Sequence, residues 1–144
     1  MFDSLTTYLN KVSLINENVA WFEVIDREAQ FEIIRLNTDD QLFDEGIRSD
    51  GTFLPDYSQR SVEEFGKPQG HIKLKDTGQF YQSFRVKVDK WGFFISADDT
   101  SIYDIPLTDT YGIDILGLTD ENMTVLTNLL KRKYLEFLDE KLSR

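Results

Sequence analysis

The sequence predicts an α+β fold, in which a small antiparallel β-sheet packs against a long N-terminal helical segment and a C-terminal helix. All 8 glycines and all 3 prolines lie between Gly46 and Gly117, so we expect turns and strands there and helices at the two ends. Hydrophobic residues recur at spacings of three and four towards both ends, and they alternate with polar residues in part of the middle. We expect one domain over residues 1–144, with a helical segment over 1–45, a loop and sheet region over 46–118 and a C-terminal helix over 119–142.

The N-terminal segment carries one amphipathic stripe, which has a gap around Asp26. Its apolar members are Leu5, Leu9, Val12, Ile15, Val19, Phe22, Ala29, Ile33 and Leu36. The polar run Asn16-Glu17-Asn18 predicts a break between a short helix and a long helix that ends near Gly46. One continuous helix is the alternative.

The first part of the middle region predicts irregular structure around one short helix. Phe53 to Tyr57 contains a proline, which is typical of a loop or an edge strand. Ser58 or Ser61 is expected to begin a short helix that runs through Phe65 and ends at Gly66.

Alternating side chains further along predict the strands of the sheet. The segments 71–75, 84–89 and 93–97 each place apolar residues on one face, and 102–105 is a weaker fourth candidate. Between the first two, Thr77 is expected to cap a short helix that carries Phe80, Tyr81 and Phe84.

The C-terminal helix has the clearest signals of any element. Thr119 is placed to cap it, and Asp120 and Glu121 follow in the first turn, where the helix dipole favours acidic side chains. Its buried stripe consists of Met123, Leu126, Leu130, Tyr134, Phe137 and Leu138.

The composition excludes several classes of function. The chain has no cysteine and one histidine, His71, which excludes thiol catalysis, iron–sulfur clusters and multi-histidine metal sites. The net charge of −10 opposes nucleic-acid binding through an overall positive field. No apolar run approaches the length of a bilayer span and no signal peptide is visible at the N-terminus, so no membrane partner is expected.

The charge is unevenly spread. Residues 67–90 hold six basic and two acidic side chains, a net +4, whereas both ends are acidic. Alternating charges on strands usually form a solvated face, and the alternative is a basic side that meets the acidic side of a neighbouring copy in a head-to-tail ring. On that alternative the candidate interface residues are Lys73, Lys75, Asp76, Thr77, Gly78, Arg85, Lys87, Asp39 and Asp40.

Asp76-Thr77-Gly78 is the triplet that aspartic proteases use, and such chemistry needs two carboxylates that share a proton. The residues that follow the triplet favour a helix, so a turn that caps this helix is the simpler interpretation. The acidic pairs Asp39-Asp40, Asp44-Glu45 and Asp98-Asp99 lack the spacing of a calcium loop. The sequence also lacks a nucleophile elbow and a phosphate-binding glycine loop, so no cofactor and no enzymatic activity are expected.

Three short motifs follow one another along the chain. The first is Leu74-Lys75-Asp76-Thr77-Gly78-Gln79-Phe80-Tyr81-Gln82-Ser83-Phe84-Arg85-Val86, preceded by the lead-in Tyr57-Ser58, Lys67 and Gly70. The closing motif is Tyr111-Gly112 followed by Ile115-Leu116-Gly117-Leu118-Thr119-Asp120-Glu121-Asn122. Over about residues 41–142 the chain resembles the head–tail joining, tail-completion and minor tail (virion-morphogenesis, neck) proteins of tailed bacteriophages and prophages. It departs from that pattern at Asp114, where the family has Pro-x-Arg before the Leu-Gly step.

This resemblance implies an α+β structural protein of the virion that does no chemistry. Such proteins assemble in the host cytoplasm into a homo-oligomeric ring, often six-fold, between the head–tail connector or adaptor and the tail tube. Passing contact with DNA near the basic strip is compatible with this role. Two alternatives stay open at this point, an aspartic-type protease built on Asp76 and a small acidic adaptor or inhibitor that mimics nucleic acid through its N-terminal helices.

Overall fold

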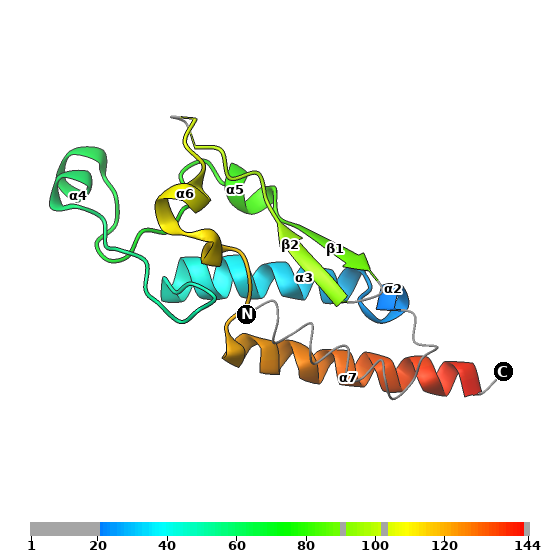
Figure 1. The fold of residues 1–144 in the computed structure, drawn as a ribbon. Helices are drawn as coiled ribbons and strands as arrows, with labels where there is room; N and C mark the ends of the chain where they lie inside the picture. The colour runs from blue at the N-terminus through cyan, green and yellow to red at the C-terminus, as the bar shows by residue number, and fades with distance from the viewer. Residues whose placement is uncertain (1–20, 90–91, 102–103, 143–144) are drawn as a thin grey trace.

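The structure is a computed structural model that describes residues 21–89, 92–101 and 104–142. Helices and strands are mixed as predicted: an antiparallel pair of strands lies over α3 (Arg27–Arg35), and the helix α7 (Asp120–Leu142) that closes the chain lies on the other side of α3 (Figure 1). The α+β prediction is therefore confirmed. The predicted break at Asn16-Glu17-Asn18 and most of the fourth strand candidate, residues 102–103, lie outside the described residues.

The N-terminal half is organised by one long helical element. After the short α2 (Trp21–Val24), Asp26 accepts a hydrogen bond from Ala29 N at 3.0 Å and begins α3 (Arg27–Arg35). The helix continues as the wider η1 (Leu36–Glu45), a π-helix, and ends at Gly46, which has the left-handed φ of 65°. The predicted end near Gly46 is confirmed, and the gap at Asp26 in the apolar stripe marks the start of α3.

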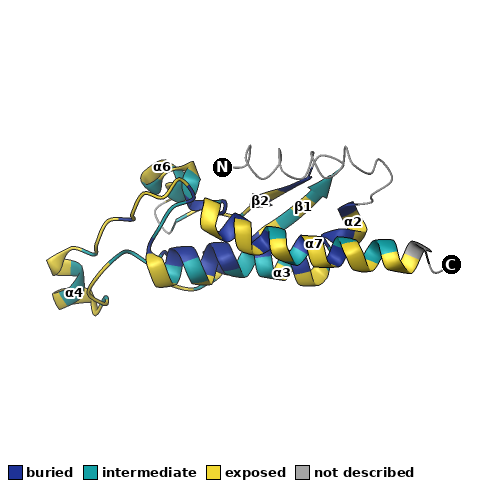
Figure 2. Cartoon of the chain, turned by 90° about the horizontal axis from the view of Figure 1, so that it is seen from below, coloured by how far each residue is buried: buried dark blue, intermediate teal, exposed yellow. Residues whose placement is uncertain are grey.

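The C-terminal helix α7 (Asp120–Leu142) lies alongside α3 and η1 (Figures 1 and 2). Thr119 caps it as predicted, because its Oγ1 accepts from Asn122 N at 3.2 Å. Lys133, only 8% exposed, donates at 2.9 Å to both Asp26 and Glu28 at the start of α3. Burial opposes the charge of Lys133, but these two hydrogen bonds outweigh it and raise the pKa of the ammonium group.

One apolar cluster forms the core between these helices and the strands. It includes Ile33 and Leu42 on the N-terminal side and Met123, Leu126 and Leu130 of the predicted α7 stripe. Figure 2 shows buried residues recurring along α3 and α7 between exposed ones. Within the described helices, none is long and apolar enough to cross a membrane.

The sheet has two strands, β1 (Arg85–Asp89) and β2 (Gly92–Ser96), paired antiparallel with Val86 opposite Ile95. These correspond to two of the predicted strands, and Phe93 and Ile95 share the buried face as predicted. This pair of strands, residues 85–89 and 92–96, is called the hairpin below.

The predicted strand at 71–75 is wrong. His71 forms only an isolated bridge with Asp56, and Leu74 turns the chain with a φ of 56° while its side chain is buried. The alternation of basic and apolar residues has another cause here. Lys73 and Lys75, on either side of Leu74, contact Phe43 at the end of η1. A positive φ at a leucine carries no sequence signal, so the pattern alone misled the prediction.

Residues 53–72 form an arm that extends away from the helices (Figures 1 and 2). Its stalk is held by hydrogen bonds from Tyr57 N to Gly70 O and from Ile72 N to Pro55 O, each at 2.8 Å. The tip is α4 (Gln59–Phe65), which begins at the capping residue Ser58 and ends at Gly66, as predicted.

Two short helices escaped prediction, α6 (Leu107–Tyr111) and the 3₁₀ turn η2 (Ile113–Ile115). The short helix predicted after Thr77 exists as α5 (Gln79–Gln82), although Gly78 takes the N-cap position. Thr77 contributes through its Oγ1, which accepts from Gln79 N at 3.3 Å.

Candidate functional site

Lys73 and Lys75 contact Phe43 at the carboxyl end of η1 and are not part of a strand. Lys73 Nζ donates to Phe43 O at 2.9 Å, and His71 Nε2 lies 2.7 Å from the same oxygen. Phe43 is in the last turn of η1, where backbone carbonyls lack partners within the helix. A cation at this end also opposes the negative pole of the helix dipole, so Lys73 stabilises its own chain.

Lys75 takes part in the same cluster through aromatic rings. Its Nζ lies 5.1 Å from the Phe43 ring centroid and 5.4 Å from that of Tyr81, within the range of cation–π attraction. Burial raises the pKa of Tyr81, and the nearby charges of Asp39 and Asp44 act in the same direction. Tyr81 therefore keeps its proton, which it donates to Lys73 O.

Asp39 and Asp40, the acidic candidates, lie in η1. The charge of Asp39 adds to the burial that raises the pKa of Tyr81, and the charge of Asp40 adds to the Glu32 hydrogen bond that raises the pKa of Arg35. None of the ion pairs formed by the described residues joins either carboxylate to a basic candidate.

Asp76, Thr77 and Gly78 form the turn that begins α5. The exposed carboxylate of Asp76 binds Lys67 Nζ, and this hydrogen bond raises the pKa of the lysine. Gly78 has a φ of 82°, which a glycine adopts without strain. Asp76 is thus paired with an ammonium group, whereas a protease dyad needs a second carboxylate. This arrangement gives no support to the aspartic-protease alternative.

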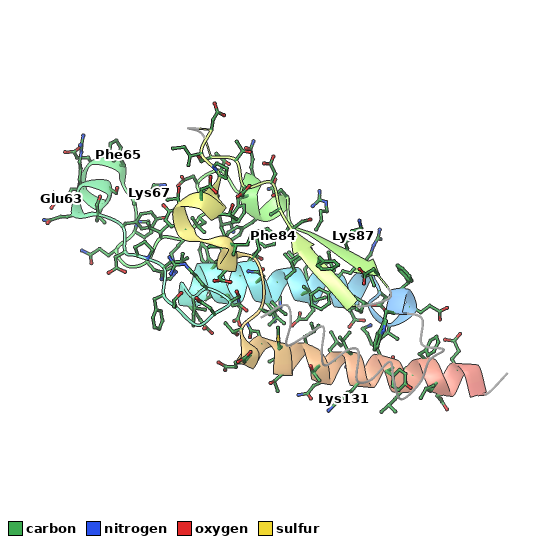
Figure 3. All side chains as sticks on the ribbon, in the orientation of Figure 1. Glu63, Phe65, Lys67, Phe84, Lys87 and Lys131 are labelled. Carbon is green, nitrogen blue, oxygen red and sulfur yellow. The ribbon has the colours of Figure 1, made fainter. Side chains whose placement is uncertain are left out.

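Arg85 and Lys87 differ from the other candidates because they lie on the outer face of the hairpin. Both are exposed, and Figure 3 shows Lys87 pointing away from the helices. Arg85 Nη1 donates to two backbone carbonyls, Gln82 O and Phe84 O, each at 2.8 Å. None of the ion pairs among the described residues includes Arg85 or Lys87.

An acidic cavity of about 410 Å³ was not predicted from the sequence. It lies where the turn after η1 meets the start of α7, and its carboxylates are Glu45, Asp50, Asp120 and Glu121. Burial raises the pKa of Glu45, and the charges of Asp40, Glu121 and Asp44 raise it further. The lining residues 45–51 and 119–121 are far apart in the sequence, so no local pattern predicted that their side chains would line one cavity. In the described part of the chain, no group of three or more His, Cys, Asp or Glu side chains is placed to hold a metal ion.

Three buried amide side chains, Asn37, Gln41 and Asn122, also escaped prediction. Asn37 Nδ2 donates to Ile115 O at 2.9 Å, and its Oδ1 accepts from Gly117 N at 2.7 Å. Gln41 Nε2 donates to Gly117 O at 2.8 Å, and its Oε1 accepts from Asn122 Nδ2 at 2.9 Å. Together they fix the Leu-Gly-Leu step of the closing motif against η1, and we call them the amide clamp.

Comparison with models of protein families, with curated proteins and with solved structures gave no match. The functional interpretation therefore rests on the residues and geometry of this chain.

Proposed function

We propose that the chain is a structural virion protein of a tailed phage or prophage, located at the head–tail junction or the tail terminus. The observation that carries the proposal is the set of three motifs in their characteristic order over about residues 41–142. The protein acts by oligomerisation and by protein–protein contacts. Its partners are further copies of itself, the head–tail connector or adaptor and the tail tube, and it assembles in the host cytoplasm before it enters the virion.

The geometry of the motif residues supports this assignment. Tyr81 of the first motif binds the segment that packs on Phe43, and Gly117 of the closing motif is held by the amide clamp. The motif residues therefore hold in place the backbone segments that pack around η1. We expect this role of residues that set the shape of an assembly protein.

Electron microscopy of tailed particles tests the proposal. Virions produced from the genome that encodes this chain are expected to contain it at the neck or the tail end, where a labelled copy would be seen. Light scattering of the purified protein, with and without the connector, measures its self-association. A protein that is absent from particles and stays monomeric in both conditions contradicts the proposal.

A second candidate, an acidic adaptor or inhibitor, is favoured by one observation. Four carboxylates, Glu45, Asp50, Asp120 and Glu121, line the cavity, and such a surface attracts basic partners. A pulldown at low salt tests it: capture of a basic host protein that Glu45→Gln and Glu121→Gln both weaken supports this candidate. Recovery of no basic partner removes it.

A further inference from the structure

The helix at the tip of the arm has exposed side chains and no buried ones. α4 carries no buried residue, and Phe65 at its end is 65% exposed. A helix of this length is marginal in water without packing against another surface. Figure 3 shows Glu63 and Phe65 at the end of the arm, away from the helices. The tip therefore presents two exposed carboxylates, Glu63 and Glu64, and the exposed ring of Phe65. It also carries Arg60, whose guanidinium pairs with Glu64 and lies 6.0 Å from the Phe65 ring centroid.

The outer face of the hairpin has the complementary character. Arg85 and Lys87 are both exposed on β1, and Phe94 of β2 lies opposite Lys87 in the register. Phe94 is 49% exposed, so an aromatic surface stands beside the two cations. A face of this composition suits a partner that brings carboxylates and an aromatic ring.

The tip and the hairpin are complementary in charge, and each has an exposed aromatic ring. Glu63 and Glu64 supply carboxylates, and Phe65 supplies the ring. Glu64 is engaged only by Arg60 at 2.9 Å, and Glu63 by Gln59 at 3.0 Å, in exposed contacts that exchange at little cost. In both views α4 and the hairpin lie well apart on the molecule, so one chain does not satisfy this match within itself (Figures 1 and 2).

We infer that the arm tip of one copy docks on the outer face of the hairpin of a second copy, with Glu63 and Glu64 facing Arg85 and Lys87 and Phe65 against Phe94. This inference rests on the proposed function, because it names the surfaces through which copies associate. The two surfaces are different, so the contact is head-to-tail and continues from copy to copy into a ring or a filament.

Cysteine cross-linking tests the contact directly, because the natural chain contains no cysteine. Two proteins, Glu63→Cys and Lys87→Cys, are purified separately, mixed and oxidised, so that only a bond between copies joins one to the other. The matched control mixes Glu63→Cys with Lys131→Cys, an exposed lysine on α7 at a distance from the hairpin (Figure 3). We expect the 63–87 dimer to form in clear excess over the 63–131 dimer.

Charge reversal provides the second measurement. Lys87→Glu is expected to weaken self-association about tenfold or more, because it sets like charges against each other at the contact. Glu63→Lys in the other partner is expected to restore it, whereas Lys131→Glu leaves it unchanged.

The outcomes separate this contact from the proposed function. Equal yields of the two cross-links, or no cross-link in a protein that still self-associates, overturn the docking but not the virion role. A monomer that forms neither cross-link also overturns the docking, and the virion role is then judged by the location of the protein in particles.

Discussion

Replacing Gln41 with leucine removes the centre of the amide clamp without creating a cavity. The Gln41 side chain is 0% exposed, and leucine fills nearly the same volume. The substitution removes the Gln41 partner that Gly117 O, Thr119 N and Asn122 Nδ2 each have at 2.8–2.9 Å. Asn122 Nδ2 keeps only its longer contact with Leu36 O, at 3.4 Å. An orphaned buried polar group costs about 1–3 kcal/mol.

The expected loss is about 3 kcal/mol of the free energy of unfolding, the lower end of that range for three groups. The lower end applies because Thr119 is only half-buried and Asn122 Nδ2 keeps its contact with Leu36 O. A loss of this size is a large part of the ~5–15 kcal/mol that keeps a domain folded.

Urea unfolding followed by circular dichroism measures the loss, with an unchanged m-value as the sign that two-state unfolding persists. The matched control is Gln59→Leu on the exposed face of α4, for which we expect a change within about 0.5 kcal/mol. If Gln41→Leu costs no more than this control, the clamp does not hold the closing motif. Adding Asn122→Leu to Gln41→Leu is expected to cost less than the two separate losses combined, because one orphaned donor disappears.

Three further outcomes follow from single sites. Gly46→Ala is expected to destabilise by about 1–3 kcal/mol more than Gly51→Ala in urea unfolding, because a Cβ at 46 would lie 2.2 Å from His71 Cγ whereas the one at 51 meets open space. Burial opposes ionisation of Asp26, but its hydrogen bonds outweigh burial and lower the pKa of the carboxyl group. The ionised carboxylate therefore stabilises the fold above pH 3.8, and this stabilisation is lost as the pH falls below that value. Asp26→Asn should therefore lose less stability than the natural chain when unfolding is measured on acidification. The pKa of Glu45 is raised, so its negative charge destabilises the fold above pH 4.5. Glu45→Gln should therefore raise the urea midpoint of unfolding at neutral pH but not in acid.

The sequence predicts those parts of the fold whose signals are local. Helix ends need particular residue types, so they could be placed from the sequence. The helix starts are capped by Ser58 and Thr119, and the helix ends lie at the left-handed glycines 46 and 66. The strand predicted around Leu74 failed, because its alternation arises from contacts to a distant helix. The candidate site divides in the same way. Lys87 on the hairpin follows from strand alternation, whereas the cavity at Glu45 depends on tertiary packing alone.

The amide clamp also has a consequence for the order of events during synthesis. Its hydrogen bonds join η1 to residues 76 to 86 positions further along the chain. While the ribosome is still making the middle of the protein, Asn37 and Gln41 have only water as partner, and the apolar face of the first helices stays open. The core thus closes only after Asn122 has emerged, and a nascent chain interrupted before that residue remains a substrate for chaperones and proteases.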